Sequence, residues 1–483
     1  MRGEMVLGLR GRIGAGLHLP ARRVKRVAVV VAVLLCAVVA GIGVGFGVTA
    51  LGTTGLVDRV AATVPPPPPV VVHPALRPAA DLGPAPTPTG VGTVLDPLVA
   101  SGGLGTLSGQ VLDPATGTVL WQQNPTTALM PGSTAKLLTA SAALLALDHQ
   151  DRLRTTVLAG AEPGTVVLVG GGDPTLSAAG PGTATGYPGA ARLDDLVAQV
   201  QTHGPVRRVL VDVSRYVGDA FAPGWFPADV AGGYIAPIEP IMLDGGREDP
   251  SQEVSPRSAK PATAAAAELA RRLGADPDTV TVGYAPPGAA VLGAVSSPPV
   301  QDLVATALTE SDNVLAEALA REVARATGAQ PSFSGASQAV LSVLRGHGFD
   351  VNGAAMVDGS GLSVDDSVPA TLLTELLGAA AAPDRSNADQ QRTVALRPLL
   401  VGLPVAGGSG TLADRYHGSA AVGRGWVRAK TGTLTGVNSL AGTVLDTEGR
   451  VLVFALLSNG PNPVSVRPRL DALAAGLRSC GCH

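Results

Sequence analysis

The longest uncharged stretch of the chain constrains its fold most, because a segment of this length and polarity belongs in a membrane. Residues 27–52 read VAVVVAVLLCAVVAGIGVGFGVTALG, 26 residues without a charged side chain. About 20 apolar residues span a bilayer as a helix, so the segment can cross with some tilt. Basic residues cluster just before it, in RRVKR at 22–26, and such residues stay on the cytoplasmic side. We therefore expect a single transmembrane anchor, with residues 1–26 in the cytoplasm.

Proline dominates the segment that follows the anchor. VPPPPPVVVHPALRPAADLGPAPTPTG at 64–90 has ten prolines between Pro65 and Pro88. This composition cannot build a core and favours an extended spacer. We expect a disordered linker over residues 53–92 and a catalytic part outside the cell membrane, in the periplasm or cell wall. A cleaved signal peptide is the alternative to the anchor, although its apolar core would be shorter.

Charge and composition exclude several classes of function. The formal net charge is −3, but residues 53–483 hold 28 basic and 37 acidic groups, a net charge of −9. A body of this charge cannot neutralise a phosphate backbone, so we expect no nucleic-acid partner. The chain has no H-E-x-x-H zinc motif, and none of its seven histidines is spaced as a ligand from another. We therefore expect no metal and no cofactor.

Lysine is rare in this chain and therefore informative. Only four of the 35 basic residues are Lys, and two of them lie in PGSTAK and RAKTGT. Arg cannot lose its proton in a protein, whereas Lys can when it is desolvated or set beside another cation. A chain so biased towards Arg retains Lys by chance or where the site needs a base.

PGSTAK has the residues of a nucleophile and its base. In a helix, Ser133 and Lys136 lie on one face, since positions i and i+3 are neighbours. A neutral Lys can remove the proton of the Ser hydroxyl and make it a nucleophile. Pro131 and Gly132 suit a helix start, where free backbone N–H groups favour a developing anion. On its own, an S-x-x-K pattern also occurs readily by chance.

Two further motifs follow in order. S-D-N at 311–313 lies between two helical stretches and could simply be a helix cap. K-T-G-T at 430–433 is predicted to lie on an edge strand, although an ordinary β-turn with an exposed cation is the alternative. The order SxxK, SxN, KTG, which uses two of four lysines in an exported chain, is much more specific than any one motif. It is the signature of penicillin-recognising serine enzymes.

With these residues, the chain resembles the D-alanyl-D-alanine carboxypeptidase/endopeptidase family of penicillin-binding protein 4 type, the low-molecular-mass class C penicillin-binding proteins. The resemblance extends over roughly residues 100–470. Further landmarks are GGGDPTL at 170–176, VLVDVSRYVG at 209–218, MVDGSGLS at 356–363, GSGTLADR at 408–415 and KTGTLTGVNSLAG from 430.

The resemblance implies roles for the motif residues in acyl transfer from peptidoglycan stem peptides and in acylation by β-lactams. Ser133 would be the acylated nucleophile, Lys136 its base and Ser311 the proton relay to the leaving amine. Asn313 would hold the substrate's peptide amide. Lys430 would also hold down the pKa of Lys136 by like-charge repulsion.

The KTGT strand would bind the substrate. Thr431, Gly432 and Thr433 are its substrate-binding residues, with Lys430 and both threonines on the terminal carboxylate. The backbone N–H groups of Ser133 and Thr433 would form the oxyanion hole.

GWFPADVAGGY at 224–234 resembles the family segment that holds the amino end of a diaminopimelate side chain. Asp229 and Tyr234 would do so, with Trp225 as a further contact; ordinary loop structure is the alternative. Relatives commonly have Arg after G-L-S, where this chain has Val364. One hypothesis is that the natural stem peptide is amidated at that carboxylate.

The implied fold is α+β: a transpeptidase fold like that of β-lactamases, with an antiparallel sheet flanked by helices. The 178 residues from Ser133 to Ser311 leave room for an inserted α/β domain. We expect the catalytic domain at 93–154 and 296–483 and the insert at 155–295.

Two other functions stay open from the sequence alone. A class A-like β-lactamase is the nearest rival enzyme, although the insert and the lack of an E-x-x-L-N-like segment count against it. A non-catalytic wall-binding protein with a retained fold is the other. In the terminal RSCGCH, Cys480 and Cys482 could form a disulfide, bind a metal with His483, or lie in a frayed tail.

Overall fold

The computed structural model describes residues 83–252, 254–384, 388–460 and 462–482. The expected anchor at 27–52 and most of the expected linker lie outside the described residues. Among the helices that these ranges form, none has the length and apolarity needed to cross a bilayer.

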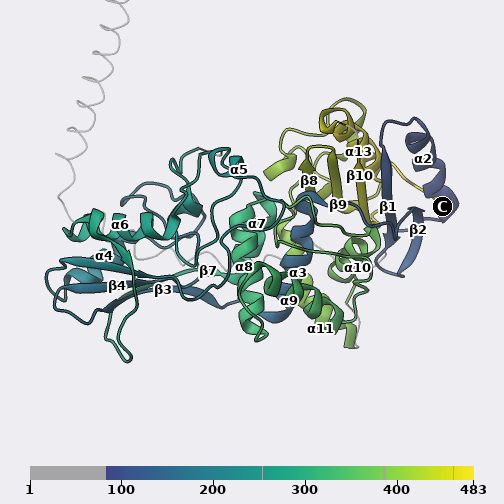
Figure 1. The fold of residues 1–483 in the computed structure, drawn as a ribbon. Helices are drawn as coiled ribbons and strands as arrows, with labels where there is room; N and C mark the ends of the chain where they lie inside the picture. The colour runs from purple at the N-terminus through teal and green to yellow at the C-terminus, as the bar shows by residue number, and fades with distance from the viewer. Residues whose placement is uncertain (1–82, 253, 385–387, 461, 483) are drawn as a thin grey trace, which may run out of the picture. The chain divides into compact units, whose positions relative to one another are not determined.

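The sheet of the catalytic domain is built from the first and last strands of the described chain. Its order is β2-β1-β10-β9-β8, and every neighbouring pair is antiparallel (Figure 1). KTGT lies on the edge strand β8, as predicted. The strands are β1 (Thr106–Asp113), β2 (Thr118–Gln123), β8 (Val427–Leu434), β9 (Val437–Leu445) and β10 (Val451–Asn459).

Strand β10 explains why the sheet has a core on both faces. Successive side chains of a strand point to opposite faces. Val453, Ala455 and Leu457 belong to one buried cluster, with α3 (Lys136–Ala146) and α10 (Ala370–Ala381). The alternate residues Leu452, Phe454 and Leu456 belong to a second cluster, with α2 (Pro88–Ala100) and α13 (Pro463–Arg478). A near-continuous apolar strand therefore marks a sheet covered by helices on both sides.

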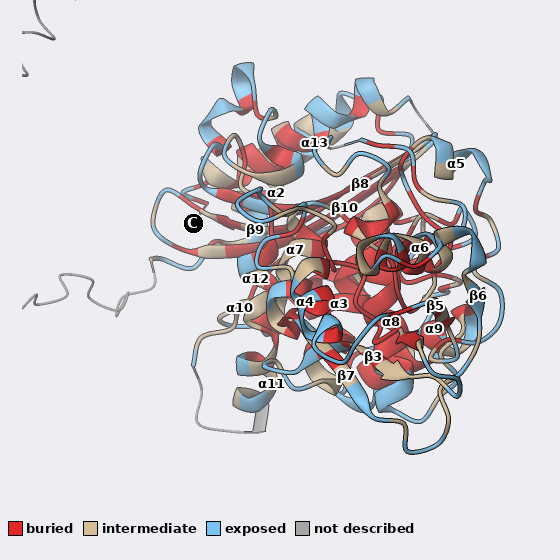
Figure 2. Cartoon of the chain, turned by 90° about the vertical axis from the view of Figure 1, so that its left-hand side faces the viewer, coloured by how far each residue is buried: buried red, intermediate tan, exposed pale blue. Residues whose placement is uncertain are grey.

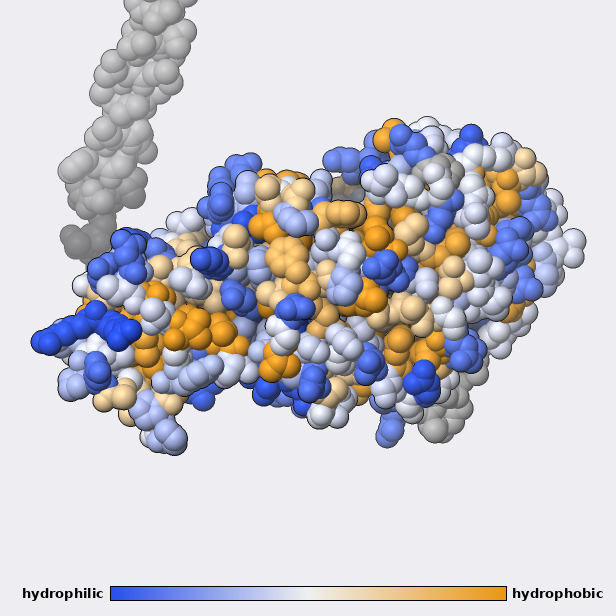
Figure 3. Space-filling model, in the orientation of Figure 1, coloured by the Kyte–Doolittle hydropathy of each residue, from blue (hydrophilic) through white to orange (hydrophobic). Residues whose placement is uncertain are grey.

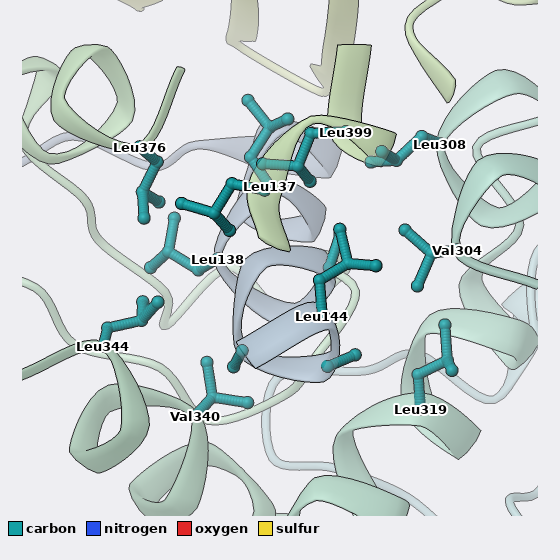
Figure 4. Packing of buried hydrophobic residues seen from close by; sticks show 14 of the residues in the cluster. Leu137, Leu138, Leu144, Val304, Leu308, Leu319, Val340, Leu344, Leu376 and Leu399 are labelled. Atoms are coloured by element: carbon teal, nitrogen blue, oxygen red, sulfur yellow. The ribbon is translucent and has the colours of Figure 1, made fainter. Parts of the chain in front are cut away.

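Helix α3 lies in the centre of the helical layer. Its residues from Lys136 to Leu144 are all buried, and Figure 4 shows its leucines surrounded by apolar side chains from the other helices. Helices α3 and α8 are correspondingly red in Figure 2. The surrounding helices are α7 (Val300–Thr309), α8 (Asn313–Ala326), α9 (Phe333–Gly346), α11 (Ala388–Leu396) and α12 (Pro398–Gly402).

The catalytic domain starts earlier than the sequence indicated, and its end is not frayed. Helix α2 begins at Pro88, with the Gly90 N–H donating to Thr87 Oγ1 at 3.0 Å. The Thr87 N–H donates to the Cys482 carbonyl at 2.6 Å, and a disulfide joins Cys480 to Cys482. The linker expected through residue 92 is therefore too long, because the amphipathic PTGVGTVLDPLVA segment packs on α13 despite its prolines.

The inserted domain has a mixed sheet of order β6-β5-β4-β3-β7. Strand β3 (Arg152–Ala159) is antiparallel to β4 (Thr165–Val169) and to β7 (Val291–Pro299), whereas β4, β5 (Arg208–Asp212) and β6 (Thr281–Val282) are parallel. The predicted insert boundaries, 155 and 295, fall inside β3 and β7. These two strands carry the chain out and back as neighbours, so the sheet of the insert extends from 152 to 299.

Helices cover one face of this second sheet. A buried cluster joins its strands to α4 (Leu193–Gln201) and α6 (Pro261–Leu273). A short helix, α5 (Ala228–Ala231), lies in the expected substrate segment. On the face seen in Figure 3, hydrophobic residues (orange) occur in patches separated by hydrophilic ones (blue).

Candidate active site

Ser133 and Lys136 meet as the sequence predicted. Ser133 lies in a 3-10 turn, η1 (Gly132–Ala135), that leads directly into α3. Gly132 has a φ of +51°, a left-handed conformation that glycine adopts without strain. The turn brings Ser133 Oγ to 2.9 Å from Lys136 Nζ. The predicted nucleophile and its predicted base are therefore in hydrogen-bond contact.

Two obligate acceptors complete the surroundings of the lysine amine. Lys136 Nζ donates to Asn313 Oδ1 at 2.5 Å and to the Ser360 carbonyl at 2.8 Å. The residue is only 1% exposed. Ser360 belongs to MVDGSGLS, a segment that the sequence comparison noted without giving any of its residues a role. Asn313, the third residue of the S-D-N motif, and the loop that carries Ser360 thus both contact the amine of Lys136.

Burial is the main reason why the lysine can act as a base. It lowers the pKa of Lys136 to about 8, while the Asp358 and Glu317 carboxyls act in the opposite direction. Burial and the charge of Lys136 together hold the pKa of Lys430 well below its usual range. The sequence analysis gave two causes for a lowered pKa of Lys136, desolvation and the charge of Lys430. Desolvation is the one that lowers it here.

Acylation of Ser133 should therefore depend on pH. Lys136 accepts a proton only when it is neutral, so the second-order rate constant for acylation should rise roughly tenfold per unit below the pKa and level off above it. With a pKa of about 8, the bend is expected near pH 8. Penicillin labelling measured between about pH 6 and about pH 9.5 checks this. A flat profile across that range would argue against Lys136 as the base.

The S-D-N motif lies at the junction of α7 and α8. Ser311 has a φ of +56°, which is uncommon for a residue with a side chain and costs about 1–3 kcal/mol. Its Oγ accepts a hydrogen bond from Lys430 Nζ at 2.9 Å. Asp312 caps α8, with the Leu315 N–H donating to its carboxylate at 2.9 Å. The helix cap at Asp312 and the left-handed backbone at Ser311 orient the motif towards the two lysines. Ser311 contacts Lys430, and Asn313 contacts Lys136.

Asp312 also ties the motif to the inserted domain. The Tyr187 hydroxyl donates to Asp312 Oδ2 at 2.7 Å, and the Arg247 guanidinium lies 3.2 Å from the same oxygen. Asn313 Nδ2 donates to the Tyr234 carbonyl at 2.9 Å. The insert therefore supports the site directly, which the motif spacing could not indicate.

The KTGT strand packs tightly against the turn that carries Ser133. A Cβ on Gly432 would lie 2.1 Å from Ser439 Oγ, 2.3 Å from the Pro131 carbonyl and 3.0 Å from the Ser133 nitrogen. A Cβ on Gly132 would lie 3.1 Å from the Thr433 nitrogen. Gly432 therefore permits the close approach of strand and turn. Its predicted part in binding substrate stays a prediction.

A cleft of about 1090 Å³ runs over these residues. Lys136 and Lys430 lie beneath it, 1% and 0% exposed. Seven of the predicted residues line it, namely Ser133, Asp229, Tyr234, Ser311, Asn313, Thr431 and Thr433.

Trp225 is not among the residues that line the cleft, and its substrate contact stays a prediction. The indole is 7% exposed and packs edge-on against Phe221 and Phe333. Its N–H donates to Asp358 Oδ2 at 2.7 Å. The next residue, Phe226, is 59% exposed and lines the cleft instead.

Sequence reasoning missed other lining residues. Thr411, whose hydroxyl lies 2.8 Å from that of Thr431, comes from GSGTLADR. Asp414 and Arg467 also line the cleft. Leu362 lines it from the loop that includes MVDGSGLS, near Val364, whose position the sequence had already indicated. Most of these residues lie in or beside segments that the sequence analysis quoted as landmarks. The sequence did not indicate which side chain of each segment faces the cleft.

Comparison with known proteins agrees with this geometry. The chain matches the family described as D-Ala-D-Ala carboxypeptidase 3 (S13), over residues 93–256 and 247–478. It is 48% identical over 468 residues to carboxypeptidase DacB of Mycolicibacterium smegmatis, covering 95% of this chain and 98% of the relative. It is 47% identical over 430 residues to carboxypeptidase Rv3627c of Mycobacterium tuberculosis, covering 88% and 91%.

A solved structure supports the fold. The crystal structure of penicillin binding protein 4 (dacB) from Haemophilus influenzae superposes with a TM-score of 0.65 at 21% identity, covering 81% of this chain and 98% of the other. The insert and the catalytic sheet thus occur together in a known architecture. From the family match and these relatives, the chain belongs to the D-Ala-D-Ala carboxypeptidase 3 (S13) family.

Proposed function

We propose that the protein is a serine-type D-Ala-D-Ala carboxypeptidase that acts on peptidoglycan stem peptides and is acylated by β-lactams at the same serine. The observation that carries this proposal is the contact of 2.9 Å between Ser133 Oγ and the amine of buried Lys136. A buried lysine with a lowered pKa beside an accessible hydroxyl is the arrangement that activates a serine.

The first half of the reaction forms the acyl-enzyme. Neutral Lys136 takes the hydroxyl proton while Ser133 Oγ attacks the carbonyl carbon of the penultimate D-Ala. The backbone N–H groups of Ser133 and Thr433 stabilise the resulting oxyanion. When the tetrahedral intermediate collapses, the C–N bond breaks. The proton that Lys136 took is relayed to the leaving amine through the hydroxyl of Ser311, which contacts Lys430, so Lys136 is neutral again.

The second half releases the shortened peptide. Water attacks the ester carbon and loses a proton to Lys136. As the bond between that carbon and Ser133 Oγ breaks, Lys136 returns this proton to Oγ and the Ser133 hydroxyl is regenerated. During binding, Asn313 holds the peptide amide. Lys430 and the hydroxyls of Thr431 and Thr433 hold the terminal carboxylate; a β-lactam presents a carboxylate of similar position to the same groups.

Side-chain recognition is assigned to the wall formed by Phe226, Asp229 and Tyr234. The Asp229 carboxylate suits the amino end of a diaminopimelate side chain, and the exposed aromatic rings suit its methylenes. Val364, 42% exposed in the same cleft, has no charge to pair with a carboxylate. A stem peptide amidated at that carboxylate therefore fits this wall better than the free acid.

The protein is thus expected to hydrolyse the amidated stem peptide faster than the free-acid peptide, by about tenfold in kcat/KM, since an unpaired carboxylate would lose its hydration there. Val364→Arg should reverse the preference by supplying a partner. Competition between the two peptides, followed by mass spectrometry, measures the ratio. Faster cleavage of the free acid by the unaltered protein would end the idea.

We also propose that residues 27–52 anchor the protein in the cell membrane and that the proline-rich segment holds the catalytic domain away from it. The support is the uncharged stretch and the basic residues before it. The catalytic domain would then be extracytoplasmic, where its substrate is.

The decisive test is labelling of residues 79–483 by a fluorescent penicillin. Intact mass should rise by one penicillin, peptide mapping should locate the adduct on Ser133, and Ser133→Ala provides the blank. Long-lived label together with release of D-Ala from a stem peptide supports the carboxypeptidase. Rapid loss of label with hydrolysis of many equivalents of penicillin would indicate a β-lactamase. A folded protein without label would indicate a wall-binding protein.

A further inference from the structure

A buried carboxylate lies behind the catalytic lysine, and none of the three motifs includes it. Asp358 is 0% exposed. Its Oδ1 accepts the N–H groups of Ser360 at 2.9 Å and Gly361 at 2.6 Å. Its Oδ2 accepts the N–H of Ser363 and the indole N–H of Trp225, both at 2.7 Å. Four donors therefore fix the position of its two oxygens.

The loop folded around Asp358 delivers acceptors to α3. The Ser360 carbonyl accepts from Lys136 Nζ at 2.8 Å, and the Gly359 carbonyl accepts from Thr139 Oγ1 at 2.6 Å. A Cβ on Gly361 would lie 2.0 Å from the Gly132 carbonyl. The loop therefore touches both the base and the turn that carries the nucleophile.

Two further carboxyls lie beside Asp358. Glu317, from α8, accepts the Gly359 N–H at 2.9 Å. Burial and the Asp358 charge raise the pKa of Glu317 to about 8 and that of Asp366 to about 10. Glu317 and Asp366 therefore favour their protonated forms at neutral pH. Five ionisable groups act on or face Lys136, namely Asp358, Asp366, Glu317, Asp312 and, from β8, Lys430.

The valence of the amine explains why the loop matters. A neutral Lys136 has two N–H groups and one lone pair. Asn313 Oδ1 and the Ser360 carbonyl can only accept, so they take the two N–H groups. The lone pair then faces the third neighbour, Ser133 Oγ, which is the geometry that proton abstraction requires. If the Ser360 carbonyl moved, the amine could rotate and lose this orientation.

We propose that Asp358 and Trp225 are positioning residues for the base: Asp358 holds the Ser360 carbonyl against Lys136, and Trp225 fixes Asp358 from the inserted domain. Trp225 directly precedes the cleft wall of Phe226, Asp229 and Tyr234. The same hydrogen bond therefore links the wall to the base. This inference rests on the proposed function, since it assigns the residues a part in that reaction.

Trp225→Phe tests the link, because it removes the N–H and keeps an aromatic ring. We expect acylation by benzylpenicillin and hydrolysis of a stem peptide to slow by the same factor, about tenfold, since both need the oriented base. Trp121→Phe is the matched control: that indole is also buried, and its N–H donates to Asp96 at 2.9 Å away from the cleft. In Trp121→Phe, the rates of acylation by benzylpenicillin and of hydrolysis of the stem peptide should stay unchanged.

Asp358→Asn tests the charge. Removing a negative neighbour lowers the pKa of Lys136, so the bend in the pH profile of acylation should move to lower pH, while the limiting rate falls. Asp366 should keep its proton, because burial is the larger cause of its raised pKa. A change of packing alone would lower the rate without moving the bend.

The outcomes separate the two proposals. If Trp225→Phe slows only the peptide, Trp225 acts on substrate and the inference is overturned; unchanged rates for both substrates overturn it as well. If the bend in the pH profile of acylation does not move in Asp358→Asn, Asp358 does not act on the base. If Asp358→Asn does not fold, the two rates of Trp225→Phe still decide. Absence of penicillin label on the unaltered protein would instead refute the proposed function.

Discussion

Lys136→Arg is expected to slow acylation of Ser133 by penicillin at least about 1,000-fold, although it preserves charge and approximate length. A guanidinium does not lose its proton in a protein, so Ser133 would have no base. The larger head group must also fit between Asn313 Oδ1 and the Ser360 carbonyl, which now lie 2.5 and 2.8 Å from the lysine nitrogen. The measurement is the time course of adduct formation by intact mass.

The chain offers a matched control for this substitution. Lys260 is exposed and lies at the start of α6, so Lys260→Arg should leave the acylation rate unchanged. Thermal unfolding of both variants separates loss of the base from loss of the fold. Retention of more than a tenth of the rate by folded Lys136→Arg would mean that another group removes the proton.

Gly432→Ala is expected to reduce acylation about 100-fold and to destabilise the domain by about 1–3 kcal/mol. The new methyl would lie 2.3 Å from the Pro131 carbonyl and 3.0 Å from the Ser133 nitrogen. Both are backbone atoms, so the strand or the turn must shift. The shift separates the N–H groups of Ser133 and Thr433 that are proposed to stabilise the oxyanion.

A glycine without neighbours provides the comparison. A Cβ on Gly346 would have nothing within 4 Å, so Gly346→Ala at the end of α9 should leave acylation unchanged and stability unchanged or slightly improved. The second-order rate constant and the midpoint of thermal unfolding are measured for both variants. An active Gly432→Ala would show that the turn can yield without losing its function.

The sequence pattern of single segments was sufficient to predict much of the structure of the catalytic domain. Strand β10 is apolar on both faces, and α8 repeats Leu315, Leu319 and Val323 at a spacing of four residues, so each element could be predicted from its own segment. Ser133 and Lys136 are three residues apart, so their contact follows from helix geometry alone. The meeting of Lys136 with Asn313 could be expected only through the family resemblance.

Other features depend on contacts between distant segments. Trp225 and Phe226 are adjacent aromatics in a loop, and no periodicity says which one faces the cleft. The indole turns inward because Asp358, more than 130 residues away, offers an acceptor there. Helix α2 was hidden by its prolines, since its stability comes from packing on α13. The predicted insert boundaries, 155 and 295, were too narrow because β3 begins before the first and β7 ends after the second.

The left-handed backbone at Ser311 means that the fold and the reaction favour different residues at one position. Folding alone would favour glycine, which adopts that conformation without strain, while the proposed proton relay needs a hydroxyl. The serine is therefore retained only as long as the reaction is under selection. In a lineage that kept the domain for binding alone, this position would be expected to drift to glycine early, and a glycine there would mark the loss of activity.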